Sequence, residues 1–137
     1  MKGIVGIPYV TNPDLLRIAV DSIPSIWPMT FIVDNSGELD PREWPCTVCS
    51  QTVPLSHAQS MNYIFRRAVA ECCQFACYMH SDARSVDDAH DRLLQAAEEI
   101  LPQDPSVAIL YTAYDALALY NLAAVRAVGG YDPNLPN

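Results

Sequence analysis

The sequence contains no run of apolar residues that approaches the ~18 residues needed to cross a bilayer as a helix. The amino terminus also lacks a basic region followed by a long apolar core, which is the pattern of a secretory signal. These two absences argue against a protein anchored by a transmembrane helix and against a secreted one. We therefore expect a soluble protein with no transmembrane segment that stays in the cytoplasm.

Basic residues are scarce. The 137 residues include 8 Lys and Arg against 16 Asp and Glu, which gives a net charge of -8. Because binding to duplex nucleic acid draws on clustered basic side chains, this balance does not favour a nucleic-acid partner. Hydrophobic residues make up 50% of the chain, too many for a disordered protein and enough for one core. We expect a single domain over residues 1–137.

The five cysteines are an odd number without a second well-spaced pair, and a cytoplasmic chain usually keeps them reduced. Cys46 and Cys49 have the spacing of a zinc or redox pair. However, the segment that begins at Cys46 alternates like a strand, and residues three apart on a strand point to opposite faces. We therefore expect neither a disulfide within this pair nor a bound zinc ion. Cys72, Cys73 and Cys77 lie in an apolar stretch and are expected to be small core residues.

Short apolar segments alternate with segments of helical periodicity along the chain. The predicted strands cover residues 3–9, 30–33, 46–53, 75–79 and 107–112, and residues 117–120 could form a further short strand. The predicted helices begin at Asn12-Pro13, at the capping box Ser56-x-x-Gln59, at Ser85-x-x-Asp88 and at Asn121, and they end at Pro24, Val69, Pro102 and Gly129. This alternation predicts an α/β fold with a mostly parallel sheet and helices on both faces.

Three of the predicted strands end in residues that suit a ligand site. These strand ends are Pro8-Tyr9, Asp34-Asn35 and His80-Ser81-Asp82. In a parallel sheet they meet at the edge where α/β proteins bind ligands. Asp82 could hold Mg²⁺ or Mn²⁺, hard cations that take carboxylate oxygens and bridge to substrate phosphates, or it could be a turn residue or helix cap. Asp34 could accept hydrogen bonds from a base or ribose, and Tyr9 could stack on the base.

Five segments, in order along the chain, resemble sequence motifs of the family 2 glycosyltransferases, which have the GT-A fold. They are Ile32-Val33-Asp34-Asn35-Ser36-Gly37, Ala58-x-x-x-Asn62 followed by Ala68, Tyr78-Met79-His80-Ser81-Asp82, Asp91-Arg92-Leu93-Leu94 and Val128-Gly129-Gly130-Tyr131-Asp132. In the family, such segments form the second-strand signature, the helix before the metal motif, the Asp-x-Asp metal motif, the helix after it and a run near the acceptor side. The resemblance spreads over nearly the whole chain and implies a GT-A-like, Rossmann-like domain.

The resemblance also implies which residues surround a nucleotide-diphospho-sugar donor. The nucleotide would be bound by Pro8, Tyr9, Asp34 and Asn35, with His57 and Asn62 nearby. Asp82 would ligate a divalent metal, Mn²⁺ or Mg²⁺, on the diphosphate. His80 replaces the first acid of the family's metal motif. Its neutral imidazole could be a second ligand that suits Mn²⁺ better than Mg²⁺, or it could be a hydrogen-bonding surface residue. The remaining histidine, His90, is expected at a solvated helix position.

The sequence departs from the family's pattern at its end. Family members continue past the Gly-Gly-x-Asp run into a segment that carries the catalytic base, whereas this chain stops at Asn137. We therefore expect a domain that lacks the usual C-terminal acceptor segment, which would be a fragment, a minimal member or a chain that no longer catalyses. Asp115 and Asp132 are the acids available as a base on the acceptor side, with a cap or turn as the alternative role of each.

The function implied by the resemblance is metal-assisted transfer of a sugar from a nucleotide-diphospho-sugar to a hydroxyl acceptor that the sequence does not identify. Two other classes compete with it. A non-catalytic nucleotide-binding module, or truncated remnant, would bind the nucleotide without turnover. A nucleotidyltransferase would need a glycine-rich, basic loop after the first strand, and residues 8–12 contain neither glycine nor a charge. The sequence leaves the oligomeric state open, and a homo-oligomer is compatible with it.

Overall fold

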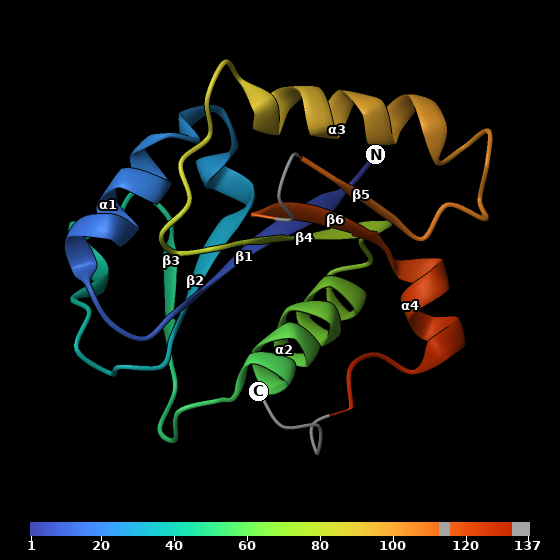
Figure 1. Ribbon diagram of the computed structural model, residues 1–137. Helices are drawn as coiled ribbons and strands as arrows, with labels where there is room; N and C mark the ends of the chain where they lie inside the picture. Colours follow the sequence, from blue (N-terminus) through green and yellow to red (C-terminus); the bar gives the residue numbers. More distant parts are fainter. Residues whose placement is uncertain (113–115, 133–137) are drawn as a thin grey trace.

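The computed structural model describes residues 1–112 and 116–132, and these form a single six-stranded sheet with helices on both faces (Figure 1). The strands are β1 (Gly3–Tyr9), β2 (Thr30–Asp34), β3 (Thr47–Ser50), β4 (Phe75–Met79), β5 (Ile109–Tyr111) and β6 (Leu117–Asn121). The helices are α1 (Pro13–Asp21), α2 (His57–Ala70), α3 (Ala89–Ile100) and α4 (Leu122–Val128), with short 3-10 turns η1 (Pro24–Met29) and η2 (Pro41–Glu43).

The strand order across the sheet is β3-β2-β1-β4-β6-β5. β1 pairs in parallel with both β2 and β4, and β2 pairs in parallel with β3. β6 is antiparallel to its two neighbours, β4 and β5, so it runs against the other five strands. The mostly parallel α/β sheet predicted from the sequence is confirmed.

Two separate hydrophobic clusters pack against the two faces of the sheet. α1, η1 and α3 cover one face, and α2 and α4 cover the other (Figure 1). The α1-side cluster includes Val5, Ile7, Leu16, Val20, Ile32, Phe75, Leu93 and Leu119. The α2-side cluster includes Ile4, Phe31, Val33, Met61, Ile64, Phe65, Ala76 and Leu122. Successive residues of one strand alternate between the clusters, as strand geometry requires.

The lack of a side chain at Gly6 allows α2 to lie close to β1. A Cβ atom at this position would come within 2.4 Å of the Ile64 side chain, closer than real Cβ atoms approach their neighbours. Gly6 therefore sets the distance between the central strand and the helix whose first turn reaches the edge of the sheet where the parallel strands end.

The two last strands differ from the prediction for residues 107–112 and 117–120. The first segment forms only the short edge strand β5, where Ile109 is 46% and Tyr111 is 66% exposed. The second forms β6, which is buried between β4 and β5. The prediction of a buried strand at 107–112 was wrong because burial depends on which segment pairs with β4. The third strand is also shorter than predicted, residues 47–50 instead of 46–53.

The start of α3 was also predicted wrongly. The helix begins at Ala89, and Asp88 precedes it in the left-handed conformation without a capping hydrogen bond from its side chain. The Oγ of Ser85 instead accepts from the backbone N–H of His90 at 3.3 Å. By contrast, both hydrogen bonds of the capping box that opens α2, between Ser56 and Gln59, are present.

The cysteines are free thiols, and the described part of the chain separates the pair that has metal-site spacing. Cys46 lies in the α1-side cluster and Cys49 packs against the α2-side cluster, so the predicted opposite faces are confirmed. Cys73 and Cys77 are buried as expected, but Cys72 is exposed. Cys72 follows the end of α2 with φ 56, and this left-handed turn directs it out of the core.

Across the described residues, none of the helices combines the length and the hydrophobicity that spanning a bilayer requires.

Candidate functional site

The parallel strands β1, β2 and β4 end at one edge of the sheet, and they bring the predicted site segments together there. Tyr9 is the register partner of Asp34 across β1 and β2. Asp82 follows the end of β4 by three residues, and β4 runs parallel to β1. Pro8, His80 and Asp82 line one hollow of about 390 Å³ at this edge, together with the loop that leads into α1. The shared edge predicted for the three strand ends is confirmed.

His80 and Asp82 place two possible metal ligands near each other on the rim of this hollow. The Nδ1 atom of His80 lies 4.0 Å from Oδ1 of Asp82, and their side chains are 41% and 68% exposed. Among residues 1–112 and 116–132, no group of three or more His, Cys, Asp or Glu side chains is arranged to hold a metal ion. The pair fits a hard or borderline divalent ion only if oxygens of a diphosphate and water complete its shell.

Asp34 is fully buried, and its carboxylate accepts hydrogen bonds from the loop that follows it. Oδ1 accepts from the backbone N–H groups of Ser36 and Gly37 and from the Ser36 hydroxyl, at 2.6–3.1 Å. Oδ2 accepts from the Ser50 hydroxyl at 3.0 Å and from Leu39 N–H at 3.4 Å. Burial alone would raise the pKa of Asp34, but these hydrogen bonds together lower it below its ordinary value. Asp34 therefore orders the loop beside the site and holds it to β3.

Asn35 is also buried, and it links the end of β2 to the entrance of α2. Its Nδ2 group donates to the Ser60 hydroxyl at 3.2 Å, and its Oδ1 atom accepts from Leu55 N–H at 2.9 Å. Leu55 and Ser60 flank the first turn of α2, which carries His57. The contacts of Asn35 thus fix where this turn begins relative to the strand ends.

The side chain of Tyr9 points into the α1-side core, where only 4% of the residue is exposed. It lines a second hollow of about 370 Å³ that also contains Asp14, Arg17, Glu38 and Trp44. The Arg17 guanidinium lies 3.9 Å above the Trp44 ring, a cation–π contact. Burial raises the pKa of Tyr9, and the nearby charges of Asp34 and Glu38 raise it further.

Sequence reasoning did not single out Arg17 and Trp44. Arg17 lies on the helix predicted to begin at Asn12-Pro13, and Trp44 lies in the loop between the strands predicted at residues 30–33 and 46–53. A tryptophan inside such a loop is the one signal that could have drawn attention to this hollow.

A row of aromatic rings connects the His80 side of the site with α2 and the last described residues. The ring of Tyr78 meets His80 and His57 edge-on, with centroids 4.9 Å and 5.4 Å away. His57 meets Tyr131 edge-on at 6.3 Å. His57 is exposed at the first position of α2, so its ring lies at the surface, in contact with Tyr78 on one side and Tyr131 on the other.

Asn62 holds the segment that follows α4. Its Nδ2 group donates to the Tyr131 carbonyl at 2.7 Å, and its Oδ1 atom accepts from Tyr131 N–H at 2.9 Å. Gly130, at φ 85, leaves the space that this double bond needs, because a Cβ atom there would lie 2.7 Å from Oδ1 of Asn62. Asn62 thus positions the Gly-Gly-Tyr-Asp segment, and both ends of its amide are engaged by that segment.

Asp132, one of the two candidate bases, does not line the hollow of Asp82. Asp132 is exposed and lines a different hollow with Tyr120, Val125 and Val128, between α4 and the β5–β6 hairpin. Asp115 lies outside the described residues.

His90 is the clearest departure from the sequence-based expectation at the site. Its expected solvated position was wrong, since only 3% of the residue is exposed. Its Nδ1 and Nε2 atoms lie 2.7 Å from Ser85 Oγ and 2.9 Å from Ser25 Oγ. Ser25 donates its own proton to Asp91 at 2.8 Å, so its oxygen can accept from Nε2–H of His90; in the neutral ring of that tautomer, Nδ1 accepts from Ser85. His90 thereby ties the loop after Asp82 to η1 on the α1 side.

We expect the substitution His90→Ala to lower the free energy of unfolding by about 2–3 kcal/mol, because it leaves two serine hydroxyls without their partner and opens a cavity. Urea unfolding at pH 7 measures this loss as a lower midpoint. His57→Ala, at an exposed position, is the matched control and should stay within about 0.5 kcal/mol of the wild type. Equal midpoints for His90→Ala and the wild type would contradict this role of His90.

No protein-family model matches the sequence, and no curated protein matches it either. The fold, by contrast, is the GT-A-like fold of solved glycosyltransferases. The mannosyltransferase PcManGT from Pyrobaculum calidifontis, in complex with GDP-Man and Mn²⁺, matches 97% of this chain with a TM-score of 0.75 and 18% sequence identity. TarS 1-349 from S. aureus matches 100% of it with a TM-score of 0.70 and 12% identity. These matches cover 48% and 52% of the two structures, so this chain spans about half their length.

Proposed function

We propose that the protein binds a nucleotide-diphospho-sugar through a divalent metal ion and transfers the sugar to a hydroxyl acceptor. The observation that carries the proposal is the placement of His80 and Asp82, which lie 4.0 Å apart in a hollow at the carboxyl edge of the sheet. The fold is shared with glycosyltransferases, and one of these was solved with a nucleotide-sugar and Mn²⁺. The proposal keeps the cytoplasmic location expected from the sequence.

In this proposal the donor lies along the loop that joins β1 to α1. The nucleoside occupies the hollow beside Tyr9, Arg17 and Trp44, which offers aromatic surface, a cation and several carboxylates. The diphosphate extends to the neighbouring hollow, where Asp82 and His80 would hold the metal. When bound, the metal neutralises charge on the diphosphate and so eases its departure. Asp34 contributes indirectly, because its hydrogen bonds fix the loop of residues 35–39 that borders the nucleoside hollow.

The transfer is a displacement at the anomeric carbon of the donor sugar. The acceptor oxygen forms a bond to that carbon while the bond from the carbon to the diphosphate oxygen breaks. The nucleoside diphosphate leaves with the bonding electron pair. The proton of the acceptor hydroxyl passes to a general base, for which Asp115 and Asp132 remain the candidates.

A second candidate function is a nucleotide-binding module without turnover. It is favoured by the position of Asp132, which lines a different hollow from Asp82. The two functions share the same nucleotide site and differ in whether sugar is released. Assays for release of nucleoside diphosphate, with and without candidate acceptors, would separate them.

A thermal-shift screen tests the proposed function directly. We expect GDP or UDP, or one of their sugar conjugates, to raise the melting temperature by about 5–10 °C at a concentration near 100 times Kd, because a ligand of the folded state stabilises it by mass action. The rise should require Mn²⁺ or Mg²⁺ and disappear with a chelator. If no nucleotide shifts the melting temperature in the presence of either metal, the proposal fails.

A further inference from the structure

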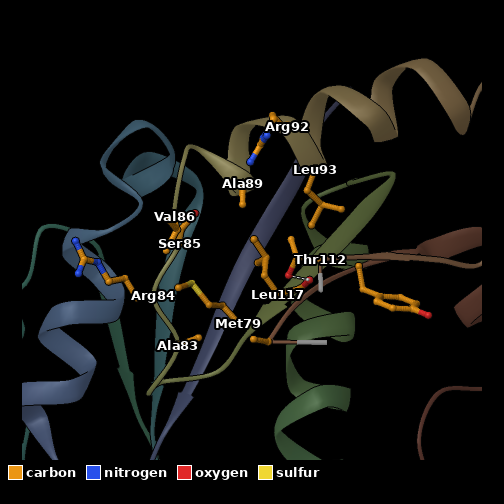
Figure 2. Close-up of a pocket in the computed structure, with 12 residues that line it drawn as sticks. Met79, Ala83, Arg84, Ser85, Val86, Ala89, Arg92, Leu93, Thr112 and Leu117 are labelled. Atoms are coloured by element: carbon orange, nitrogen blue, oxygen red, sulfur yellow. Dashed lines mark hydrogen bonds between the residues drawn. The ribbon is translucent and has the colours of Figure 1, made fainter. Parts of the chain in front are cut away.

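A cavity of about 580 Å³ lies directly after the metal-site segment, on the α1 side of the sheet (Figure 2). Met79 at the end of β4 lines it, and so does the segment from Ala83, the residue that follows Asp82, through the loop into the start of α3. Thr112, Ala116 and Leu117 of the β5–β6 hairpin form the opposite wall. A hydrogen bond of 2.9 Å from His80 N–H to the Ala116 carbonyl joins the metal-site segment to that wall. The cavity therefore adjoins the edge of the sheet that holds Asp82.

The inner wall of this cavity is apolar. Figure 2 shows the side chains of Met79, Leu93 and Leu117 in the middle of the lining. The two aliphatic hydroxyl groups in the lining, those of Ser85 and Thr112, already have partners. Ser85 pairs with His90 at 2.7 Å, and Thr112 donates to the Leu117 carbonyl at 3.3 Å. The wall thus fits the apolar body of a ligand and offers it few hydrogen bonds.

Two arginines line the cavity at its margin. Arg92 stands on the first turn of α3 beside Ala89, whereas the Arg84 side chain extends from the loop away from Met79 and Leu117 (Figure 2). They are two of only eight basic residues in a chain of net charge -8. Neither forms an ion pair with a carboxylate of the described residues. Free guanidinium groups bind phosphate and carboxylate groups well, since their planar donors match two oxygens at once.

We propose that this cavity binds the acceptor of the sugar, and that the acceptor is an amphiphilic anion. Its apolar body would lie against Met79, Leu93 and Leu117, and its phosphate or carboxylate group would lie at Arg92. The hydroxyl that receives the sugar would then face the adjoining Asp82 edge. This assignment rests on the proposed function, and the transfer step is the one described there. Cavities of this volume hold ligands of drug-like size.

Calorimetric titration of the full chain with small probes tests the proposal. We expect n-octyl phosphate or octanoate, below their micelle concentrations, to bind, and comparison of the two identifies the preferred anionic group. Neutral n-octyl glucoside should bind at least tenfold more weakly, and inorganic phosphate alone should give no measurable binding. Arg92→Gln should weaken binding of the anionic probe about fivefold to tenfold.

Two further variants keep the test specific. Arg126→Gln, on the exposed face of α4 and outside the cavity, is the matched control and should bind the anionic probe like the wild type. Ala89→Leu should weaken binding because the larger side chain fills part of the cavity. Affinity for GDP or UDP with Mn²⁺ should be the same in Arg92→Gln and the wild type, which keeps the acceptor cavity distinct from the donor site.

Failure of this proposal can be told apart from failure of the proposed function. If nucleotides bind but neither anionic amphiphile does, or if Arg92→Gln binds the anionic amphiphile like the wild type, the acceptor cavity is disproved and the donor site stands. If an amphiphile binds through Arg92 but no nucleotide binds with either metal, the acceptor role is overturned together with the proposed function.

Discussion

The substitution Asp82→Asn is expected to weaken Mn²⁺-dependent binding of the nucleoside diphosphate by about tenfold or more, which corresponds to ~1.4 kcal/mol. Among the described residues, Asp82 is the only carboxylate that lines its hollow, and a neutral amide is a much poorer ligand for a hard divalent ion. The fold should not change, because the two side chains are nearly equal in size and this one is 68% exposed. Isothermal titration of GDP or UDP with Mn²⁺ into both proteins measures the difference.

Two comparisons make this result specific to the metal. Binding of the bare nucleoside should be the same in Asp82→Asn and the wild type, because its hollow is formed by other residues. Asp87→Asn, in the same loop, is the matched control, and asparagine tolerates the left-handed conformation of Asp87, at φ 51. If Asp82→Asn and the wild type bind the diphosphate equally in Mn²⁺, Asp82 is a turn residue and the metal assignment is wrong.

The substitution Asp34→Asn is expected to lower the free energy of unfolding by about 2–4 kcal/mol. It removes a buried charge that accepts five hydrogen bonds, and it turns an amide N–H₂ group toward donors such as Ser50 and Leu39. Urea unfolding at pH 7 measures the loss. Asp14→Asn, at an exposed position in the same part of the molecule, should change stability by less than about 0.5 kcal/mol.

The effect of Asp34 should also depend on pH in a definite direction. Because folding lowers the pKa of Asp34, its contribution is complete above the ordinary value of 3.8 and is lost as the pH falls through the lower folded value. The stability difference between the wild type and Asp34→Asn should therefore shrink when urea unfolding is repeated at acid pH. A difference that stays constant from pH 7 into this range would show that the loop does not depend on the charge.

The parts of the fold that depend on local interactions could be predicted from the sequence. The capping box Ser56-x-x-Gln59 was identified correctly because both of its hydrogen bonds lie within four residues. The pattern Ser85-x-x-Asp88 has the same form, yet it does not open a helix. Ser85 instead bonds His90, which in turn bonds Ser25, a residue 65 positions away. No short-range pattern contains that information.

The site shows the same division between local and distant information. The turn chemistry after β2 indicated that Asp34 ends a strand at the edge of the sheet, which the structure confirms. The sequence of this turn does not show whether the Asp34 carboxylate faces a ligand or its own loop. That depends on Ser50, which reaches Asp34 only after β3 has paired with β2. Likewise, the cavity beneath α3 joins Arg92 to Leu117, and only the pairing of β6 with β4 brings them together.

β6 lies between β4 and β5 in the sheet although it follows β5 in the sequence, and this arrangement restricts the order of folding. β5 comes before β6 along the chain, yet among the described strands β6 is its only neighbour in the sheet. Residues 109–111 therefore cannot join the sheet until residues 117–121 have paired with β4, so the two strands must add as a preformed hairpin or in reverse sequence order. β1, β2 and β4 can assemble without them, because all their mutual pairings lie within residues 3–79. During synthesis, the six strands and α-helices from β1 to β4 can thus gain their contacts on the ribosome, while the wall opposite Arg92 closes last.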